Sequence, residues 1–222
     1  MKTNLVKNTA WLAAGNICTK GINLIMIPLF SAWLSTEDYG TFDLYCTYIT
    51  LLIPFLSLSS SDAIFRFSVE NDSMEAKQKY ITAGLSINLI LGLLTILLLT
   101  IVTLLFDWKL GFPFIALLIC ELFNGHLQGF MRAIRKLELY SIGNIVSTIC
   151  IAFFVTLFIY VNNLGVEGII YGYAMGFFSG NLLMVIVSKY FKYISFRALN
   201  IDTFKEIAKY SLPLIPNNLS SG

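Results

Sequence analysis

TAWLAAGNICTKGINLIMIPLFSAW, residues 9–33, is an apolar run long enough to cross a bilayer, and a lysine, Lys20, lies near its middle. A charged side chain at the centre of a bilayer costs roughly 2.5–3.5 kcal/mol on insertion scales, so another interaction must offset that cost. In a helix, Asn16, Lys20 and Asn23 would share one face. The pattern predicts that this segment forms one wall of a polar cavity inside a helical bundle.

The composition is that of an integral membrane protein. Of the 222 residues, 57% are hydrophobic and only 13% are charged, whereas about a quarter of an ordinary soluble domain is charged. The net charge of +2 gives no basic field for nucleic acid, so no nucleic-acid partner is expected. The four cysteines lie in apolar runs without metal-ligand spacing, and we expect neither a metal nor another cofactor.

Six segments have the length of membrane spans. A bilayer core of about 30 Å needs ~20 mostly apolar residues per helix, and such segments lie at about 9–33, 41–65, 80–106, 112–131, 140–162 and 166–188. We therefore predict an all-α polytopic membrane protein in which residues 1–189 form a six-helix lobe. Residues 190–210 are predicted to form a cytoplasmic juxtamembrane connector. Residues 211–222 would begin a seventh helix that is cut short, as in a fragment of a longer protein.

Lysine and arginine are concentrated on one side of these predicted spans. Thirteen of the fifteen lie at the N-terminus or in the second, fourth and sixth loops, whereas Lys109 lies on the other side and Lys20 lies inside a span. Short loops rich in lysine and arginine stay in the cytoplasm. We therefore expect the N-terminus to be cytoplasmic.

The second predicted span carries Pro54 on a face of small polar residues. A proline in a spanning helix frees a backbone carbonyl and often marks a bend beside a cavity. At the cytoplasmic end, Asp62 and Arg66 are four residues apart, which suits an ion pair. The pair could be merely interfacial, or Arg66 could capture an anion at the mouth of the cavity.

The fourth predicted span carries a polar stripe made of Glu121, Asn124, Gln128, Arg132 and Arg135. Polar side chains at this depth face the bundle interior or water. Glu121 is the expected partner of Lys20, either as a structural tie or as part of a transport path. His126 lies off the stripe, and we interpret it as a hydrogen-bonding residue between packed helices.

Gly168, Gly172, Gly176 and Gly180 repeat every four residues, which allows another helix to approach closely. In a chain with six predicted spans, packing within the chain is a commoner use of such a ridge than dimerisation. No catalytic triad, phosphate-binding loop or metal motif occurs, and the loops are short. We therefore do not expect an enzyme.

Several of these features resemble a known family. Pro28 near the outer end of the first span, the turn LSTEDYG at 34–40 and the closing YSLPLIPNN at 210–218 resemble the Wzx-type O-antigen and polysaccharide flippases. These belong to the multidrug/oligosaccharidyl-lipid/polysaccharide (MOP) exporter superfamily. The resemblance implies one lobe of a MATE-like two-lobe transporter in the bacterial inner membrane. It would flip polyprenyl-diphosphate-linked oligosaccharide by alternating access, with membrane lipids and other polysaccharide-assembly membrane proteins as further partners.

The resemblance also implies cationic groups in the lumen. The candidate substrate-binding residues are Lys20, Arg66, Asn16 and Asn23. The candidate cavity or coupling residues are Glu121, Asp62, Asn124 and Gln128.

Three other functions stay open. A multidrug/cation antiporter of the same superfamily would favour a cavity of carboxylates and aromatic rings, and Lys20 argues against it. A membrane glycan polymerase or ligase would need a long extracytoplasmic loop bearing arginines or histidines. A structural or partner-binding subunit has only the glycine ridge in its favour.

Overall fold

The computed structural model describes residues 33–220 together with Gly21, Leu24 and Pro28, and the regular elements of this part are all helices. The predicted first span, with Lys20, Asn16 and Asn23, lies almost entirely outside the described residues. The long helices are α2 (Thr36–Leu56), α3 (Ser60–Glu70), α4 (Met74–Leu105), α5 (Gly111–Ala133), α6 (Leu137–Thr156) and α7 (Gly165–Ser188). A π-helical turn, η1 (Leu157–Val161), extends α6. After α7 follow the elements η2 (Tyr190–Tyr193), η3 (Phe196–Ala198), α8 (Ile201–Ser211), η4 (Leu212–Leu214) and α9 (Ile215–Ser220).

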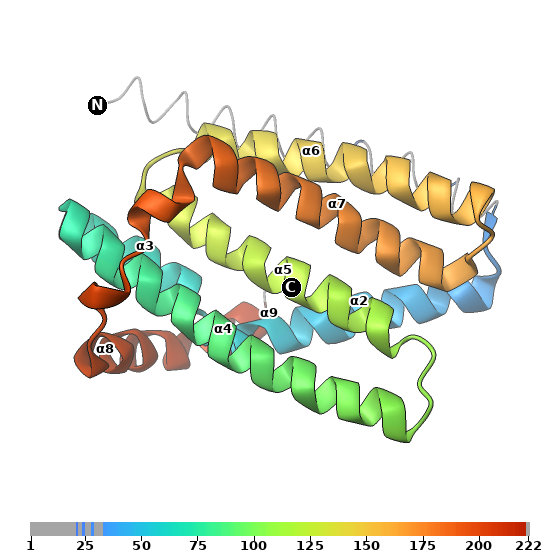
Figure 1. The fold of residues 1–222 in the computed structure, drawn as a ribbon, viewed down its shortest axis with the longest axis horizontal. Coiled ribbons are helices and arrows are strands. Elements are labelled where there is room, and N and C mark those ends of the chain that lie inside the picture. The colour runs from blue at the N-terminus through green and yellow to red at the C-terminus, as the bar shows by residue number, and fades with distance from the viewer. Residues whose placement is uncertain (1–20, 22–23, 25–27, 29–32, 221–222) are drawn as a thin grey trace.

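The helices form a bundle with α5 near its centre. In Figure 1, α6, α7, α5 and α4 lie side by side as a front layer. α2 and α3 pack against α5, and α2 also contacts α7 while α3 contacts α4. The connections alternate between the two ends of the bundle, so that the α3–α4, α5–α6 and α7–α8 connections share one end (Figure 1). We call this end the basic end, because most of the described lysines and arginines lie in or beside these connections.

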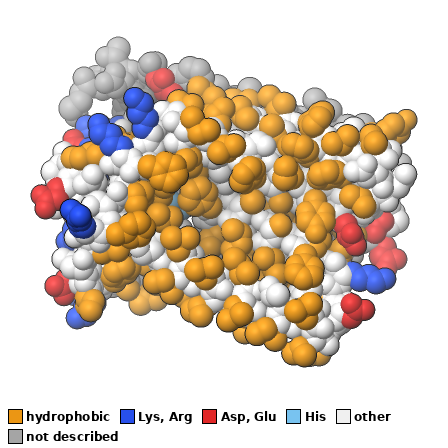
Figure 2. Space-filling model, viewed as in Figure 1, with side chains coloured by type: hydrophobic (Ala, Val, Ile, Leu, Met, Phe, Trp, Pro, Cys, Tyr) orange, Lys and Arg blue, Asp and Glu red, His pale blue; other side chains and the backbone are white. Residues whose placement is uncertain are grey.

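The outer surface has the polarity of a membrane protein. α4, α5, α7 and the continuous segment Leu137–Val161 are each long and apolar enough to cross a bilayer, and α2 with α3 qualifies as a bent pair. Figure 2 shows charged side chains at the two ends of the molecule and a broad apolar band between them. The predicted fold class, an all-α polytopic lobe, is therefore confirmed.

The second predicted span is broken beside its proline. α2 and α3 meet at an angle of 44°, and Leu58 and Ser59 between them have φ values of 48° and 47°. Pro54 has no N–H to donate to the preceding turn, and its own carbonyl accepts a hydrogen bond from the Ser59 N–H at 3.0 Å. The continuous span predicted for 41–65 is thus two helices, and the bend expected from Pro54 is confirmed.

The glycines of α7 pack against α6 within the chain. A Cβ added at Gly172 would lie 2.8 Å from the backbone nitrogen of Val155, and one at Gly176 would lie 2.7 Å from that of Ile151. In α5, a Cβ at Gly129 would meet the backbone oxygen of Ser61 at 2.7 Å, whereas Gly125 has no such neighbour within 4 Å. The α6–α7 and α3–α5 contacts therefore both depend on the absence of a side chain.

We expect Gly176→Leu to lower the yield of folded protein severalfold, because overpacking a close helix contact costs about 1–3 kcal/mol. Gly40→Leu is the matched control, since Gly40 is exposed on α2 and a Cβ there would meet nothing within 4 Å. Fluorescence-detected size-exclusion chromatography of membrane extracts measures the monodisperse fraction. Equal fractions for the two variants would show that the α6–α7 contact tolerates side chains.

Candidate functional site

Two polar cavities adjoin the contact between α3 and α5, and both are bordered by the same ion pair. The inner cavity, of about 300 Å³, is lined at the α2–α3 break and on the facing helices by Pro54, Ser60, Asn88, Gly125, His126 and Gln128, among others. The outer cavity, of about 540 Å³, is lined by Arg66, Glu70, Tyr210 and Asn217, among others. Asp62 and Arg132 line both cavities.

The ion pair joins α3 to α5. The Arg132 Nη2 donates to Asp62 Oδ1 at 3.0 Å and to the Ser61 Oγ at 2.9 Å. The guanidinium also lies over the Phe65 ring, 5.3 Å from its centroid. The close approach at Gly129 brings the two helices near enough for these contacts. Because the pair is partly buried, removing one partner would leave the other charge poorly solvated.

The inner cavity contains polar atoms that have no hydrogen-bond partner among the described residues. The side chain of Asn88 is buried, and neither its Oδ1 nor its Nδ2 is bonded. The Ser60 Oγ and the Arg132 Nε are also buried and unbonded. A buried polar group without a partner costs about 1–3 kcal/mol. The residues that line this cavity therefore hold donors and acceptors that are shielded from solvent in this structure.

The first turn of α3 also borders the inner cavity. The Ser59 N–H, just before this helix, donates to the Ser57 Oγ at 3.2 Å, and the Ser60 N–H donates to the Ser57 backbone oxygen at 3.0 Å. The N–H groups of a helix N-terminus carry a partial positive charge and favour anions. Asp62, in this first turn, supplies such a negative charge and pairs with Arg132, so this wall of the inner cavity carries one charge of each sign.

Arg66 lies in the outer cavity with a different partner from the one predicted. Its Nε donates to Glu70 Oε1 at 2.8 Å, and its guanidinium carbon lies 4.5 Å from the centroid of the Tyr210 ring. The expectation that Asp62 pairs with Arg66 was wrong, because the contact between α3 and α5 places Arg132 at Asp62. Arg66, with about half of its side chain exposed, remains at the mouth of the cavity.

The side chains of the predicted polar stripe of α5 do not all face the same environment. Gln128 lines the inner cavity, whereas the Asn124 Nδ2 donates to Asn181 Oδ1 on α7 at 2.9 Å. Asn181 in turn donates to the backbone oxygen of Cys120 at 2.9 Å. Asn124 thus ties α5 to α7 and is absent from the lining of both cavities.

Glu121 and His126 occupy the interior of the bundle. Glu121 is partly buried on α5, within electrostatic reach of Cys46 and Tyr173, and forms no salt bridge with a described residue. Its pairing with Lys20 stays a prediction, since Lys20 lies outside the described part. The His126 Nε2 is 2.7 Å from the Tyr190 Oη, which confirms the predicted packing hydrogen bond.

Asn88 and Ser60 line the inner cavity but were not predicted from the sequence. A signal for Asn88 was present, because it is an asparagine within the most apolar of the candidate spans, Met74–Leu105. Polar residues at such a position face the protein interior. Ser60 gave no such signal, since it lies among four neighbouring serines, Ser57 and Ser59–Ser61.

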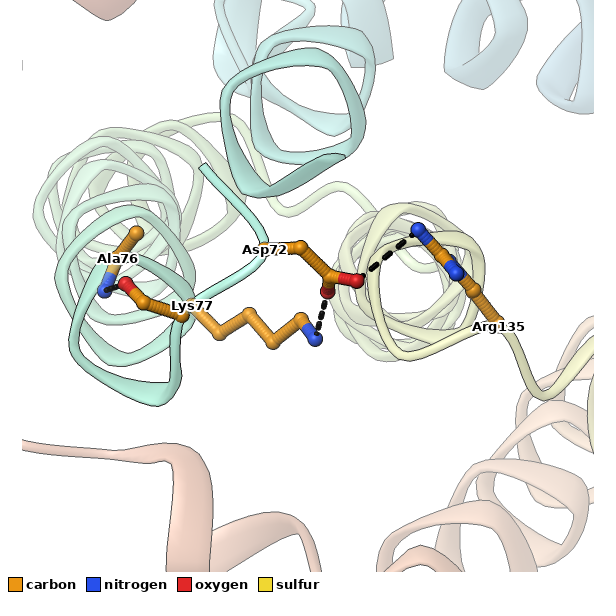
Figure 3. Close-up of polar contacts among 5 residues, drawn as sticks. Asp72, Ala76, Lys77 and Arg135 are labelled. Atoms are coloured by element: carbon orange, nitrogen blue, oxygen red, sulfur yellow. Dashed lines mark hydrogen bonds and ion pairs between the residues drawn. The ribbon is translucent and has the colours of Figure 1, made fainter. Parts of the chain in front are cut away.

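A second charged cluster fixes the basic end of the bundle. Figure 3 shows Asp72, in the α3–α4 connection, between Lys77 of α4 and Arg135 just after α5. Its Oδ2 is 3.0 Å from the Arg135 Nη2, and its Oδ1 accepts a hydrogen bond from Lys77. The hydrogen bond and charge of Lys77, with a further contribution from Arg135, hold the pKa of Asp72 below its usual value.

Comparison with known proteins identifies the family. The model of the polysaccharide biosynthesis protein family matches residues 5–221. The chain belongs to this family. No curated protein matches this polysaccharide biosynthesis protein.

Solved structures share the fold. An outward-facing multidrug resistance MATE family transporter of the MOP superfamily matches with a TM-score of 0.74 and 20% identity, over 96% of this chain and 53% of its own. A MATE transporter in complex with Br-NRF matches with a TM-score of 0.71 and 21% identity, over 99% and 56%. An inward-facing MATE family transporter matches with a TM-score of 0.59 and 19% identity, over 78% and 44%. The predicted MATE-like lobe is therefore confirmed as a fold, and the chain spans about half the length of these transporters.

We predict that acidification removes the contribution of Asp72 to stability. The pKa of Asp72 is lower in the folded state than in the unfolded state. Its ion pairs therefore stabilise the fold fully at pH values above the unfolded-state pKa of about 3.9. This stabilisation is lost as the pH falls through the folded-state pKa. The thermal midpoint of Asp72→Asn should lie below that of the parent protein at pH 7, and the difference should vanish at acidic pH. Asp107→Asn is the control, since Asp107 forms no salt bridge within the described residues. A difference that does not change with pH would contradict the assignment.

Proposed function

We propose that this polysaccharide biosynthesis protein forms one lobe of a two-lobe flippase, and that the intact transporter moves polyprenyl-diphosphate-linked oligosaccharide across the bacterial inner membrane by alternating access. The proposed role is transport and not catalysis. The observation that carries this proposal is the pair of polar cavities that share Arg132, with Arg66 at the outer mouth. Family membership and the MATE-like fold support it.

The chemistry of these cavities suits a diphosphate. Arginine presents a planar fork of donors that matches phosphate oxygens, and such charge-assisted hydrogen bonds are stronger than neutral ones. They strengthen further where water is partly excluded. In this account a diphosphate competes with Asp62 for Arg132 and with Glu70 for Arg66.

The first predicted span would complete the proposed substrate path. We propose that Lys20, Asn16 and Asn23 add substrate contacts, and that Glu121 neutralises Lys20 when the substrate is absent. Gln128 and Asp62, which line the inner cavity, are proposed as cavity or coupling residues. The orientation proposed from the charge distribution places the basic end of the bundle, and with it the N-terminus, in the cytoplasm.

A multidrug antiporter is the second candidate. It is favoured by the likeness to MATE transporters and by the partly buried carboxylate of Glu121. The flippase and the antiporter differ in how their activity would respond to removal of an arginine charge from the cavities. Removing a cation from the cavity should weaken binding of an anionic substrate, whereas it should not weaken extrusion of a cationic drug.

The test uses the intact protein in cells that lack their own copy, at matched protein levels. Arg66→Ala should lower surface glycan at least about tenfold, which corresponds to one charge-assisted hydrogen bond. Arg197→Ala, an exposed arginine of η3 without a described salt bridge, is the control and should export normally. Lipid-linked glycan should accumulate inside the cells that carry Arg66→Ala.

The role of Arg132 needs a paired design, because Arg132→Ala alone leaves the Asp62 charge without its partner. The double variant Asp62→Ala with Arg132→Ala removes both charges, so a merely structural pair would be rescued. We expect export to stay low in the double variant. Wild-type export by both Arg66→Ala and the double variant, or drug extrusion in place of glycan export, would contradict the proposal.

A further inference from the structure

A further hollow, distinct from the inner and outer cavities, lies on the side of α5 that faces away from the ion pair. It is an apolar groove of about 480 Å³ between α4 and α7, with α5 as its floor, lined among others by Leu89, Ile119, Phe123, Phe178, Leu182 and Phe191. A smaller apolar hollow of about 150 Å³ adjoins it, sharing Leu89, Ile119 and Phe123. The groove lies in the apolar band between the charged ends of the molecule in Figure 2.

The few polar side chains at this groove direct their hydrogen bonds into the protein. The Asn181 amide is bonded to Asn124 and to the backbone oxygen of Cys120. The hydroxyl of Tyr190 is bonded to His126 at 2.7 Å. The walls therefore present almost only carbon, which excludes a polar occupant and favours a hydrocarbon chain.

Two lysines are adjacent in sequence to the residues that line the basic end of the groove. Tyr190 and Phe191 line this end, and Lys189 and Lys192 flank them in sequence. Both lysines are exposed, and neither forms a salt bridge with a described acidic residue. The Gln78 side chain of α4 donates to the Lys192 backbone oxygen at 3.1 Å, which holds the turn across this end.

We propose that this groove binds one anionic phospholipid, with an acyl chain along α4 and α7 and its phosphate at Lys189 and Lys192. The carbon walls accept the chain, and the lysines supply the charge complementarity that a zwitterionic lipid would not satisfy. Basic residues at a membrane surface contribute about 1 kcal/mol each toward anionic lipid, so one lysine corresponds to about fivefold in affinity. The inference is independent of the transported substrate.

Native mass spectrometry of the purified intact protein tests this site, with phosphatidylglycerol and phosphatidylcholine added in competition. The parent protein should retain phosphatidylglycerol at least about fivefold more than phosphatidylcholine. Lys189→Ala with Lys192→Ala should remove this preference. Lys205→Ala with Lys209→Ala, two exposed lysines of α8, is the charge-matched control and should keep it.

A second pair of variants tests the groove itself. Leu89→Trp should fill the groove and lower phosphatidylglycerol retention to the level of phosphatidylcholine. Leu97→Trp should not, because Leu97 is exposed to a similar degree on the same helix and lies outside the groove lining. Equal retention by Leu89→Trp and Leu97→Trp, or a preference that survives loss of Lys189 and Lys192, would overturn the proposal.

Discussion

The contact between α3 and α5 is the constraint on which the polar interior depends. Gly129 lets the backbone of Ser61 approach α5 within the space that a side chain would occupy. At this separation the Arg132 guanidinium reaches both Asp62 and Ser61. A wider separation would break the pair, merge the two cavities and expose the unbonded groups of Asn88 and Ser60. The ion pair and the glycine contact therefore stabilise the same arrangement.

α5 separates two different environments. On one side it borders the polar cavities through Gln128 and Arg132, and on the other it forms the floor of the apolar groove through Ile119 and Phe123. Hydrogen bonds from its remaining polar side chains tie it to neighbours, with Asn124 bonded on α7 and His126 bonded to Tyr190. A membrane-embedded lobe needs both surfaces, since charge must be held away from lipid while the outer face stays apolar.

The sequence predicted features that arise from local chemistry. The bend at Pro54 follows from the missing N–H, and the α6–α7 contact follows from a four-residue glycine period. The approximate positions of the spans follow from the lengths of the apolar runs, and the basic end follows from the positions of lysine and arginine between those runs. Features set by the relative rotation of helices were harder to predict. Asp62 has candidate partners in Arg66 on its own helix and in Arg132 on α5, and only the interhelical distance decides between them. Asn124 and Gln128 belong to one stripe, yet they contact different neighbours.

The central proposal is that water reaches the polar cavity beside the α3–α5 contact from the basic end of the bundle, and thiol labelling of Gln128→Cys tests it most directly. The parent for this experiment has its four cysteines replaced by alanine, and Leu97→Cys on the lipid-facing side of α4 serves as the reference. A membrane-impermeant maleimide should label Gln128→Cys in inside-out membrane vesicles at least about tenfold faster than Leu97→Cys, because thiolate forms in water and not in hydrocarbon. Equal and negligible labelling of the two cysteines would contradict the account.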